Sequence, residues 1–223
     1  MGWTGFIAAF AFFFLSHLLP VRPPLRTALV RVLGQGGFTL TYSALSVGVL
    51  ALLIVEAGRA PHIPLWPWAA WQNHLALAIM VLACAVLALA LGRPNPFSFG
   101  GVRNETFDPQ RPGLVRLTRH PLLLALALWS LAHLIANGDM AHALLFGAFG
   151  AFATFGGRLV DKRKQRELGS NWGALSEEVR QQPIGRIFKS APACDALRLV
   201  AAGALFQALI WLHPVVIGVS PLP

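Results

Sequence analysis

The chain has 223 residues, of which 56% are hydrophobic and only 12% are charged, about half the charged fraction of a typical soluble domain. Eighteen lysines and arginines outnumber nine acidic residues, so the net charge is +9. This polar surface is too small for a soluble basic domain, which excludes a nucleic-acid-binding protein, and two cysteines (Cys84 and Cys194) cannot build a disulfide scaffold or a zinc cage.

Six apolar runs follow one another along the chain, each close to the roughly 20 residues that a helix needs to cross a bilayer. The runs are continuous rather than alternating, which is typical of helices and not of strands. We therefore expect an all-α integral membrane protein, one domain over residues 1–223, with a bundle of about six transmembrane helices in contact with the lipid bilayer. The predicted spans are residues 3–19, 37–55, 66–91, 121–136, 140–157 and 199–219.

The basic residues between these spans predict the orientation. Three lie in residues 20–36, five in 92–120 and nine in 158–198, whereas Arg59 alone lies on the other side. Lysine and arginine accumulate in the cytoplasmic loops of membrane proteins. This pattern predicts a cytoplasmic segment over 158–198 and places both termini on the outer side of the membrane.

Histidines are the main residues that could support chemistry. Four histidines within predicted spans stand out, because an ionisable group there is costly and suggests a function. Histidine is a common axial ligand of haem iron, and helix bundles build such sites from facing helices. The alternative is that each histidine bonds a neighbouring helix or reaches the headgroup region. The four are His17, His74, His133 and His213.

A second feature is the tract from Arg116 to Pro121, with the sequence Arg-Leu-Thr-Arg-His-Pro. Proline is well suited to the first turn of a helix, so Pro121 is expected to begin the fourth span. Arg119 and His120 would then lie at its cytoplasmic mouth and favour an anion. The alternative is an ordinary membrane anchor of basic residues.

Three stretches together resemble the NnrU family of bacterial membrane proteins, which are associated with denitrification and nitric oxide metabolism. The chain is also similar to plant and cyanobacterial zeta-carotene isomerases, which are membrane haem b proteins. The resemblance implies a multi-pass protein of the bacterial cytoplasmic membrane with periplasmic termini, and haem b as cofactor. Its implied partners are a hydrophobic small molecule or denitrification components. The stretches are Leu15–His17 leading to Arg22-Pro23-Pro24-Leu25-Arg26, Thr118–Pro121, and Trp129–His133.

The resemblance also implies site residues. The two haem-ligating histidines of the isomerases correspond to His17 and His133, with Arg119 and His120 near the mouth of the site. The isomerases have a cysteine three residues before the second histidine, where this chain has Ser130. A serine cannot replace a thiolate ligand, which argues against a cysteine-based switch. If the protein is an enzyme, the resemblance implies an isomerase-like or redox activity that depends on haem.

Two alternatives remain open. The Arg-His-Pro tract and the charged segment from Asp161 to Pro183 are distantly similar to isoprenylcysteine carboxyl methyltransferases. In those enzymes the two stretches cradle S-adenosylmethionine, which would place Arg119, His120 and residues 167–172 at that cofactor. The other alternative is a non-catalytic membrane partner that assists assembly of a denitrification complex.

The predicted topology places the two proposed haem ligands at different depths. His17 lies five residues before Arg22, roughly 7 Å from the cytoplasmic end of its span, and His133 lies fourteen beyond Arg119, roughly 21 Å from that face. Spans 121–136 and 140–157 therefore form either a tilted, partial hairpin, in which Asp139 is functional, or a full crossing. A full crossing groups His74, His133, His142 and His213 in the outer half and leaves His17 with His120 in the inner half.

Overall fold

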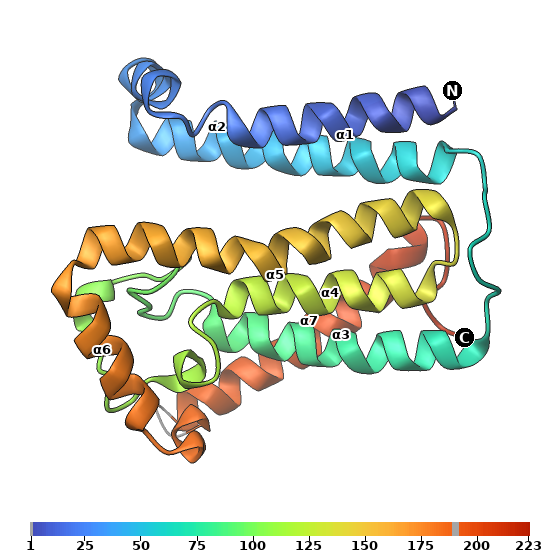
Figure 1. Cartoon of the computed structure of the whole chain (residues 1–223). Coiled ribbons are helices and arrows are strands. Elements are labelled where there is room, and N and C mark those ends of the chain that lie inside the picture. The colour runs from blue at the N-terminus through green and yellow to red at the C-terminus, as the bar shows by residue number, and fades with distance from the viewer. Residues whose placement is uncertain (1, 189–191) are drawn as a thin grey trace. The chain divides into compact units, whose positions relative to one another are not determined.

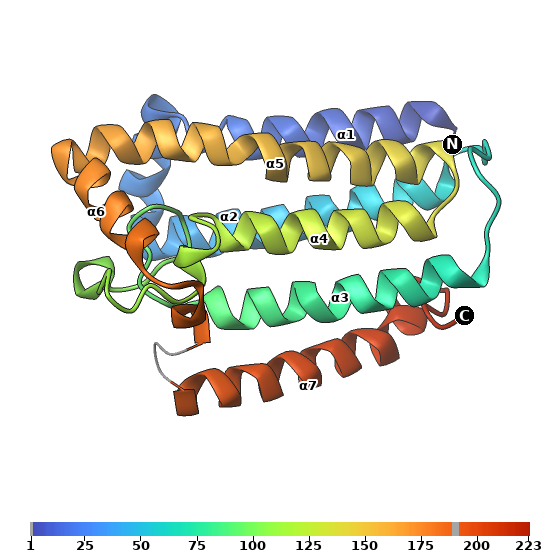
Figure 2. The same cartoon turned by 60° about the horizontal axis from the view of Figure 1, so that its bottom comes forward.

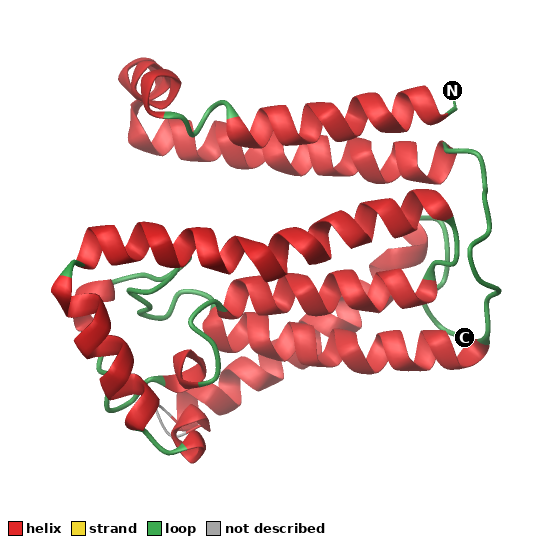
Figure 3. Ribbon diagram, viewed as in Figure 1, coloured by secondary structure: helices red, strands yellow, loops and turns green. Residues whose placement is uncertain are grey.

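The computed structural model describes residues 2–188 and 192–223, and all of its regular elements are helices (Figure 3). This confirms the predicted all-α class. The chain divides into two units, each defined internally. The first comprises Met1–Trp66 with Asp139–Leu145, and the second comprises Pro67–Gly138 with Phe146–Pro223.

The first unit contains α1 (Trp3–Leu18) and α2 (Pro23–Arg59), which run alongside each other (Figure 1). Residues 20–36, predicted as a loop, are mostly helical, because Pro23 begins α2 two residues after a tight turn. Gly34 interrupts α2 with φ 71° and ψ 166°, a conformation that suits glycine and kinks the helix. The apolar run 37–55 lies beyond this kink.

Asp139 is the first residue of the segment Asp139–Leu145, which belongs to the first unit and contains the start of α5 (Met140–Leu168). The rest of α5 belongs to the second unit. Its carboxylate Oδ1 accepts hydrogen bonds from the backbone N–H groups of Ala141 (3.1 Å) and His142 (3.2 Å). An aspartate in this position caps a helix N-terminus. Asp139 therefore caps the start of α5, and its Oδ2 also lies 2.6 Å from Nδ1 of His142.

The second unit contains the remaining helices. α3 (Ala70–Ala90) packs against both α4 (Pro121–Ala136) and α7 (Pro192–Val216), and α5 lies alongside α4 (Figure 2). α5 continues past the predicted span to Leu168, and α6 (Ser170–Gln181) follows it as a separate short helix. Three short 3₁₀ helices complete the unit: Asn104–Thr106, Gly113–Arg116 and Ile184–Phe188.

Four of the described helices are long and apolar enough to cross a membrane, namely α2, α3, α5 and α7. The other two apolar helices, α1 and α4, have 16 residues each. At 1.5 Å per residue they reach about 24 Å, less than the roughly 30 Å of a bilayer's hydrocarbon core. The structure thus establishes a helical chain with four candidate spans, and a bundle of six full spans stays a prediction.

The helices of the second unit alternate in direction, so one end of the unit gathers the C-terminus of α3 and the N-termini of α4 and α7. Arg198 of α7 donates hydrogen bonds to the carbonyl oxygens of Ala88 (2.6 Å) and Leu91 (2.7 Å) at the end of α3. His120, just before α4, contacts Asp161 near the end of α5. We call this the basic end of the unit. His133 and His213 lie toward the opposite end.

Candidate functional site

His133 lines a cavity of about 340 Å³ between α3, α4 and α7, at the end of the second unit opposite its arginines. Most of the lining is apolar, which suits a small hydrophobic ligand, and the volume lies in the range of about 300–1,000 Å³ typical of ligand sites. The lining residues include Leu77, Met80, Phe206, Leu209, Ile210, Asn73, His133 and His213.

The His133 side chain is held by its own helix and by α5. Its Nδ1 donates a hydrogen bond to the carbonyl oxygen of Trp129, at 2.9 Å, one turn earlier in α4. A carbonyl can only accept, so Nδ1 is the donor and carries a proton. Hydrogen bonds of this kind orient histidine ligands in metal sites. Trp129 and Phe146 pack against the ring with centroid distances of 5.0 and 4.9 Å.

A second imidazole lies close to His133 within the same unit. The ring centroids of His133 and His213 are 6.4 Å apart and the rings are inclined by 28°. The Nδ1 of His213 donates to the carbonyl oxygen of Val219 at 2.7 Å, so this nitrogen also carries a proton. Gly218, with φ 91°, turns the chain back after α7 and places the Val219 carbonyl there.

The two imidazoles are stacked and both line the same cavity, so one ligand in that cavity could contact both rings. Among residues 2–188 and 192–223, no group of three or more His, Cys, Asp and Glu could hold a metal ion. A haem iron needs only one or two side chains, because the porphyrin supplies the other four ligands.

His17, the other predicted ligand, belongs to the first unit and lies near the end of α1. Its Nδ1 contacts the carbonyl oxygen of Phe13 at 2.7 Å, and the Phe13 ring stacks on it at 4.1 Å. Tyr42 of α2 packs beside it, with centroids 6.1 Å apart. His17 and His133 thus lie in different units, and their pairing on one iron stays a prediction.

Ser130 occupies the position of the isomerase cysteine. It is 1% exposed, and its hydroxyl donates to the carbonyl oxygen of Leu126 at 2.8 Å. This hydrogen bond satisfies the hydroxyl within α4. Ser130 is therefore a packing residue of the α4–α5 contact, where it faces Gly150.

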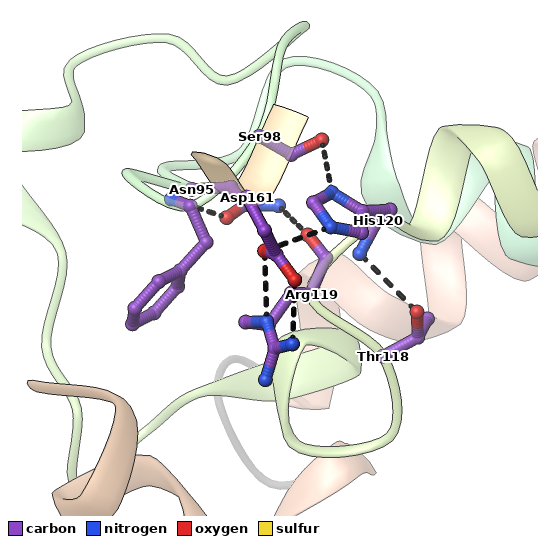
Figure 4. A network of polar contacts seen from close by, with 7 residues as sticks. Asn95, Ser98, Thr118, Arg119, His120 and Asp161 are labelled. Atoms are coloured by element: carbon purple, nitrogen blue, oxygen red, sulfur yellow. Dashed lines mark hydrogen bonds and ion pairs between the residues drawn. The ribbon is translucent and has the colours of Figure 1, made fainter. Parts of the chain in front are cut away.

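Arg119 and His120 form a separate polar network at the basic end, centred on Asp161 of α5 (Figure 4). The Arg119 guanidinium donates from Nε to Oδ1 (3.1 Å) and from an Nη to Oδ2 (2.7 Å) of Asp161. His120 Nε2 lies 3.0 Å from the same Oδ1, and its Nδ1 lies 3.0 Å from the hydroxyl of Ser98. Along α4, His120 is about 20 Å from His133, so these two residues do not share a site.

Close backbone packing supports this network. Asn95 donates from Nδ2 to the carbonyl oxygen of Arg119 at 2.9 Å, and Trp172 of α6 lies 5.3 Å beneath the Arg119 guanidinium. Gly157 of α5 lies against the His120 ring, where a Cβ atom would come within 2.9 Å of His120 Cδ2. The glycine thus lets the imidazole reach Asp161.

Burial lowers the pKa of His120 below its ordinary value of 6.5, an effect that outweighs the Asp161 carboxylate, which raises it. The ring is therefore neutral near pH 7, with Nε2–H donating to Asp161 and Nδ1 accepting from the Ser98 hydroxyl. The ring nitrogens are used in the reverse of a serine–histidine–aspartate triad, in which serine bonds Nε2 and aspartate bonds Nδ1. Ser98 is also only 2% exposed, so this network lacks the accessible nucleophile of such a triad.

The structure therefore brings some predicted residues together and separates others. Arg119 and His120 meet each other and the 161–172 segment, while His133 meets His213. Ser98 and Asn95 could not be predicted, because no local sequence pattern marks either residue. Asp161 belongs to the predicted charged segment, and His213 is one of the histidines within a predicted span. Their partners could not be predicted, because these are distant in sequence.

The fold and these sites define a helical, membrane-type protein. Its second unit has an apolar cavity lined by histidines at one end and the Arg119–His120–Asp161 network at the other. The family model described as NnrU protein matches residues 5–221, and the chain belongs to this family. A search among curated proteins found no match, and neither did a search among solved structures.

Proposed function

We propose that this NnrU-family membrane protein binds haem b and that His133 is an axial ligand. The observation that supports the proposal is the pair His133 and His213, two imidazoles whose Nδ1 atoms bond backbone carbonyl oxygens and whose ring centroids lie 6.4 Å apart in an apolar cavity. Haem, when bound, supplies an iron centre that can change redox state or take up a diatomic ligand. The association with nitrite and nitric oxide metabolism follows from the family resemblance.

Within this proposal, the chain's own residues orient the ligands and exclude water. The carbonyl oxygens of Trp129 and Val219 hold the two imidazoles by their Nδ1 atoms. Hydrogen bonds of this kind fix the tautomer and the ring orientation of a metal ligand. The surrounding apolar side chains, among them Met80 and Phe206, keep the cavity at low polarity.

Two residues are candidates for the second axial ligand. The resemblance to the isomerases favours His17, whereas proximity within one unit favours His213. Ser130 provides no thiolate, so an isomerase-like activity would have to proceed without a cysteine–histidine ligand exchange.

Absorption spectra of the purified protein test the proposal. We expect a Soret band that is lost in His133→Ala. Of His17→Ala and His213→Ala, the variant that removes the second ligand should show a reduced or shifted band. His74→Ala is the matched control, because His74 also bonds a carbonyl one turn earlier (Ala70, 2.8 Å) but is exposed on α3. A preparation that stays colourless after haem supplementation, or a spectrum unchanged by His133→Ala, would contradict the proposal.

A second candidate function is an S-adenosylmethionine-dependent methyltransferase. One observation favours it: Arg119 and His120 line a cavity of about 360 Å³ at the basic end, and Trp172 packs against the Arg119 guanidinium. Binding of S-adenosylmethionine that is abolished by His120→Ala would support this function. If neither haem nor S-adenosylmethionine binds, the non-catalytic assembly role is favoured.

A further inference from the structure

A third cavity, of about 440 Å³, lies at the basic end of the second unit; it is separate from the His133 cavity and adjoins the 360 Å³ cavity, with which it shares Val115. The end of α3, the 92–113 loop and the start of α7 enclose it. Its described charged lining consists of one carboxylate, Asp108, and four arginines, which are Arg93, Arg103, Arg111 and Arg198. We call it the arginine pocket.

Two of these arginines are held in place by the fold. Arg93 forms an ion pair with Asp195, a residue only 5% exposed at the start of α7. Arg198 donates to two carbonyl oxygens at the end of α3. These contacts join α3 to α7 and order both side chains before any ligand arrives, which lowers the entropic cost of binding.

The other two arginines have weak or no acidic partners. Arg111 lies 4.0 Å from Asp108, and both side chains are more than half exposed. Arg103 forms no ion pair with any described residue, and its backbone adopts φ 54°, the one positive value outside glycine in the described part of the chain. Non-glycine residues in this conformation cluster at ligand clamps and active sites. Positive charge therefore exceeds negative charge in the pocket.

The walls of the pocket determine what kind of anion fits. Leu89 and Leu114, two lining residues, belong to one apolar cluster. Leu91 and Val102 are sequence neighbours of other lining residues, and they are 55% and 51% exposed. Guanidinium groups match phosphate oxygens in pairs of parallel hydrogen bonds. The pocket thus combines phosphate recognition with an apolar surface at the end of two candidate spans, α3 and α7.

From this placement we infer that the arginine pocket binds a phosphate group, and that its source is the headgroup of an anionic phospholipid. Basic pockets between the cytoplasmic ends of membrane helices are known to suit such headgroups. The inference does not depend on haem binding, because the pocket and the His133 cavity lie at opposite ends of the unit.

Calorimetric titration of the full chain in zwitterionic detergent tests the inference. The probes are short-chain phosphatidylglycerol, short-chain phosphatidylcholine and inorganic phosphate. We expect phosphatidylglycerol to bind at least about tenfold more tightly than phosphatidylcholine, and the double variant Arg103→Gln/Arg111→Gln to remove most of this preference. The matched control is Arg163→Gln/Arg166→Gln, which removes the same charge from exposed positions of α5 outside the pocket.

The outcomes are distinguishable. If inorganic phosphate binds as tightly as phosphatidylglycerol and with the same dependence on Arg103 and Arg111, the phosphate site is supported but its ligand is soluble. An equal loss in both double variants would show only diffuse attraction and would overturn the inference, as would no loss in either. Arg111→Glu, which leaves the unusual backbone at Arg103 untouched, repeats the test if the double variant has altered helix content by circular dichroism.

Discussion

The neighbours of His120 determine the protonation of its imidazole ring. Its side chain is 12% exposed and lies between an acceptor, Asp161, and a hydroxyl, Ser98, which satisfy both ring nitrogens when the ring is neutral. Asp161 in turn receives two hydrogen bonds from Arg119, so its negative charge is already compensated. The charges of Arg119 and Asp161 therefore balance without a second proton, and hence without a positive charge, on His120.

This arrangement predicts a pH dependence of stability. The pKa of His120 is lower in the folded protein than the ordinary value of 6.5, chiefly through burial, so the folded state binds fewer protons than the unfolded state below that pH. The stabilisation is fully present above pH 6.5 and is lost as the pH falls through the lower folded pKa.

We expect the Tm of the wild-type protein to fall more steeply than that of His120→Asn between about pH 7.5 and about pH 5. Asparagine is polar, does not titrate, and is well accepted before a helix. Thermal unfolding followed by circular dichroism measures the two slopes, and the other histidines are common to both proteins. Parallel slopes would show that His120 does not contribute to the pH dependence.

At the scale of elements, α4 and α5 approach closely because small residues lie between them. Gly150 faces Ser130, and Gly157 faces His120. Gly157 lies in the second half of a continuous helix, where a glycine is otherwise unfavourable relative to alanine. Its presence there is explained by the imidazole that packs on it.

Gly157→Ala is expected to destabilise the protein despite the higher helix propensity of alanine. Overpacking costs about 1–3 kcal/mol, against a propensity gain of about 0.5–1 kcal/mol. A net loss of 1 kcal/mol lowers the Tm of a chain of this length by about 2–4 °C. Gly147→Ala on the same helix is the control, since a Cβ there meets no atom within 4 Å and should raise the Tm. Equal Tm changes in the two variants would rule out the contact as the cause.

The start of a helix could be predicted where a nearby residue in the sequence determines it. Features that depend on residues distant in sequence could not be predicted. Pro121 begins α4 as expected, since proline suits a first helical turn. The kink at Gly34 was not predicted, because residues 20–36 contain three arginines and resemble a loop in composition. Pairing of Arg93 with Asp195 was likewise out of reach, since the two residues are 102 positions apart.

At the scale of the whole molecule, we propose that the membrane faces follow the distribution of charge. In the second unit, Arg93, Arg119 and Arg198 lie at one end, and the His133 cavity lies at the other. The predominance of basic residues in cytoplasmic segments predicts that the arginine-rich end faces the cytoplasm.

Labelling with a membrane-impermeant maleimide tests this orientation. Cys84 is buried and Cys194 is exposed at the basic end, so labelling of the wild-type protein reports Cys194. We expect Cys194 to react only after cells are permeabilised. Ser220→Cys, introduced with both natural cysteines replaced by alanine, should react in intact cells, because Ser220 is part of the opposite end. The reverse pattern would invert the proposed topology.

By itself, the sequence determined the helical, membrane-type class and the family, because the length and hydropathy of a run and the spacing within a motif are properties of contiguous residues. The structure confirms the all-helical class, with four helices long and apolar enough to cross a membrane, and the family model confirms the family. Only the tertiary structure decided which distant side chains meet: His133 with His213, Arg119 and His120 with Asp161, and four arginines around one pocket. These pairings depend on the relative rotation and axial register of helices, which the composition of each helix does not specify.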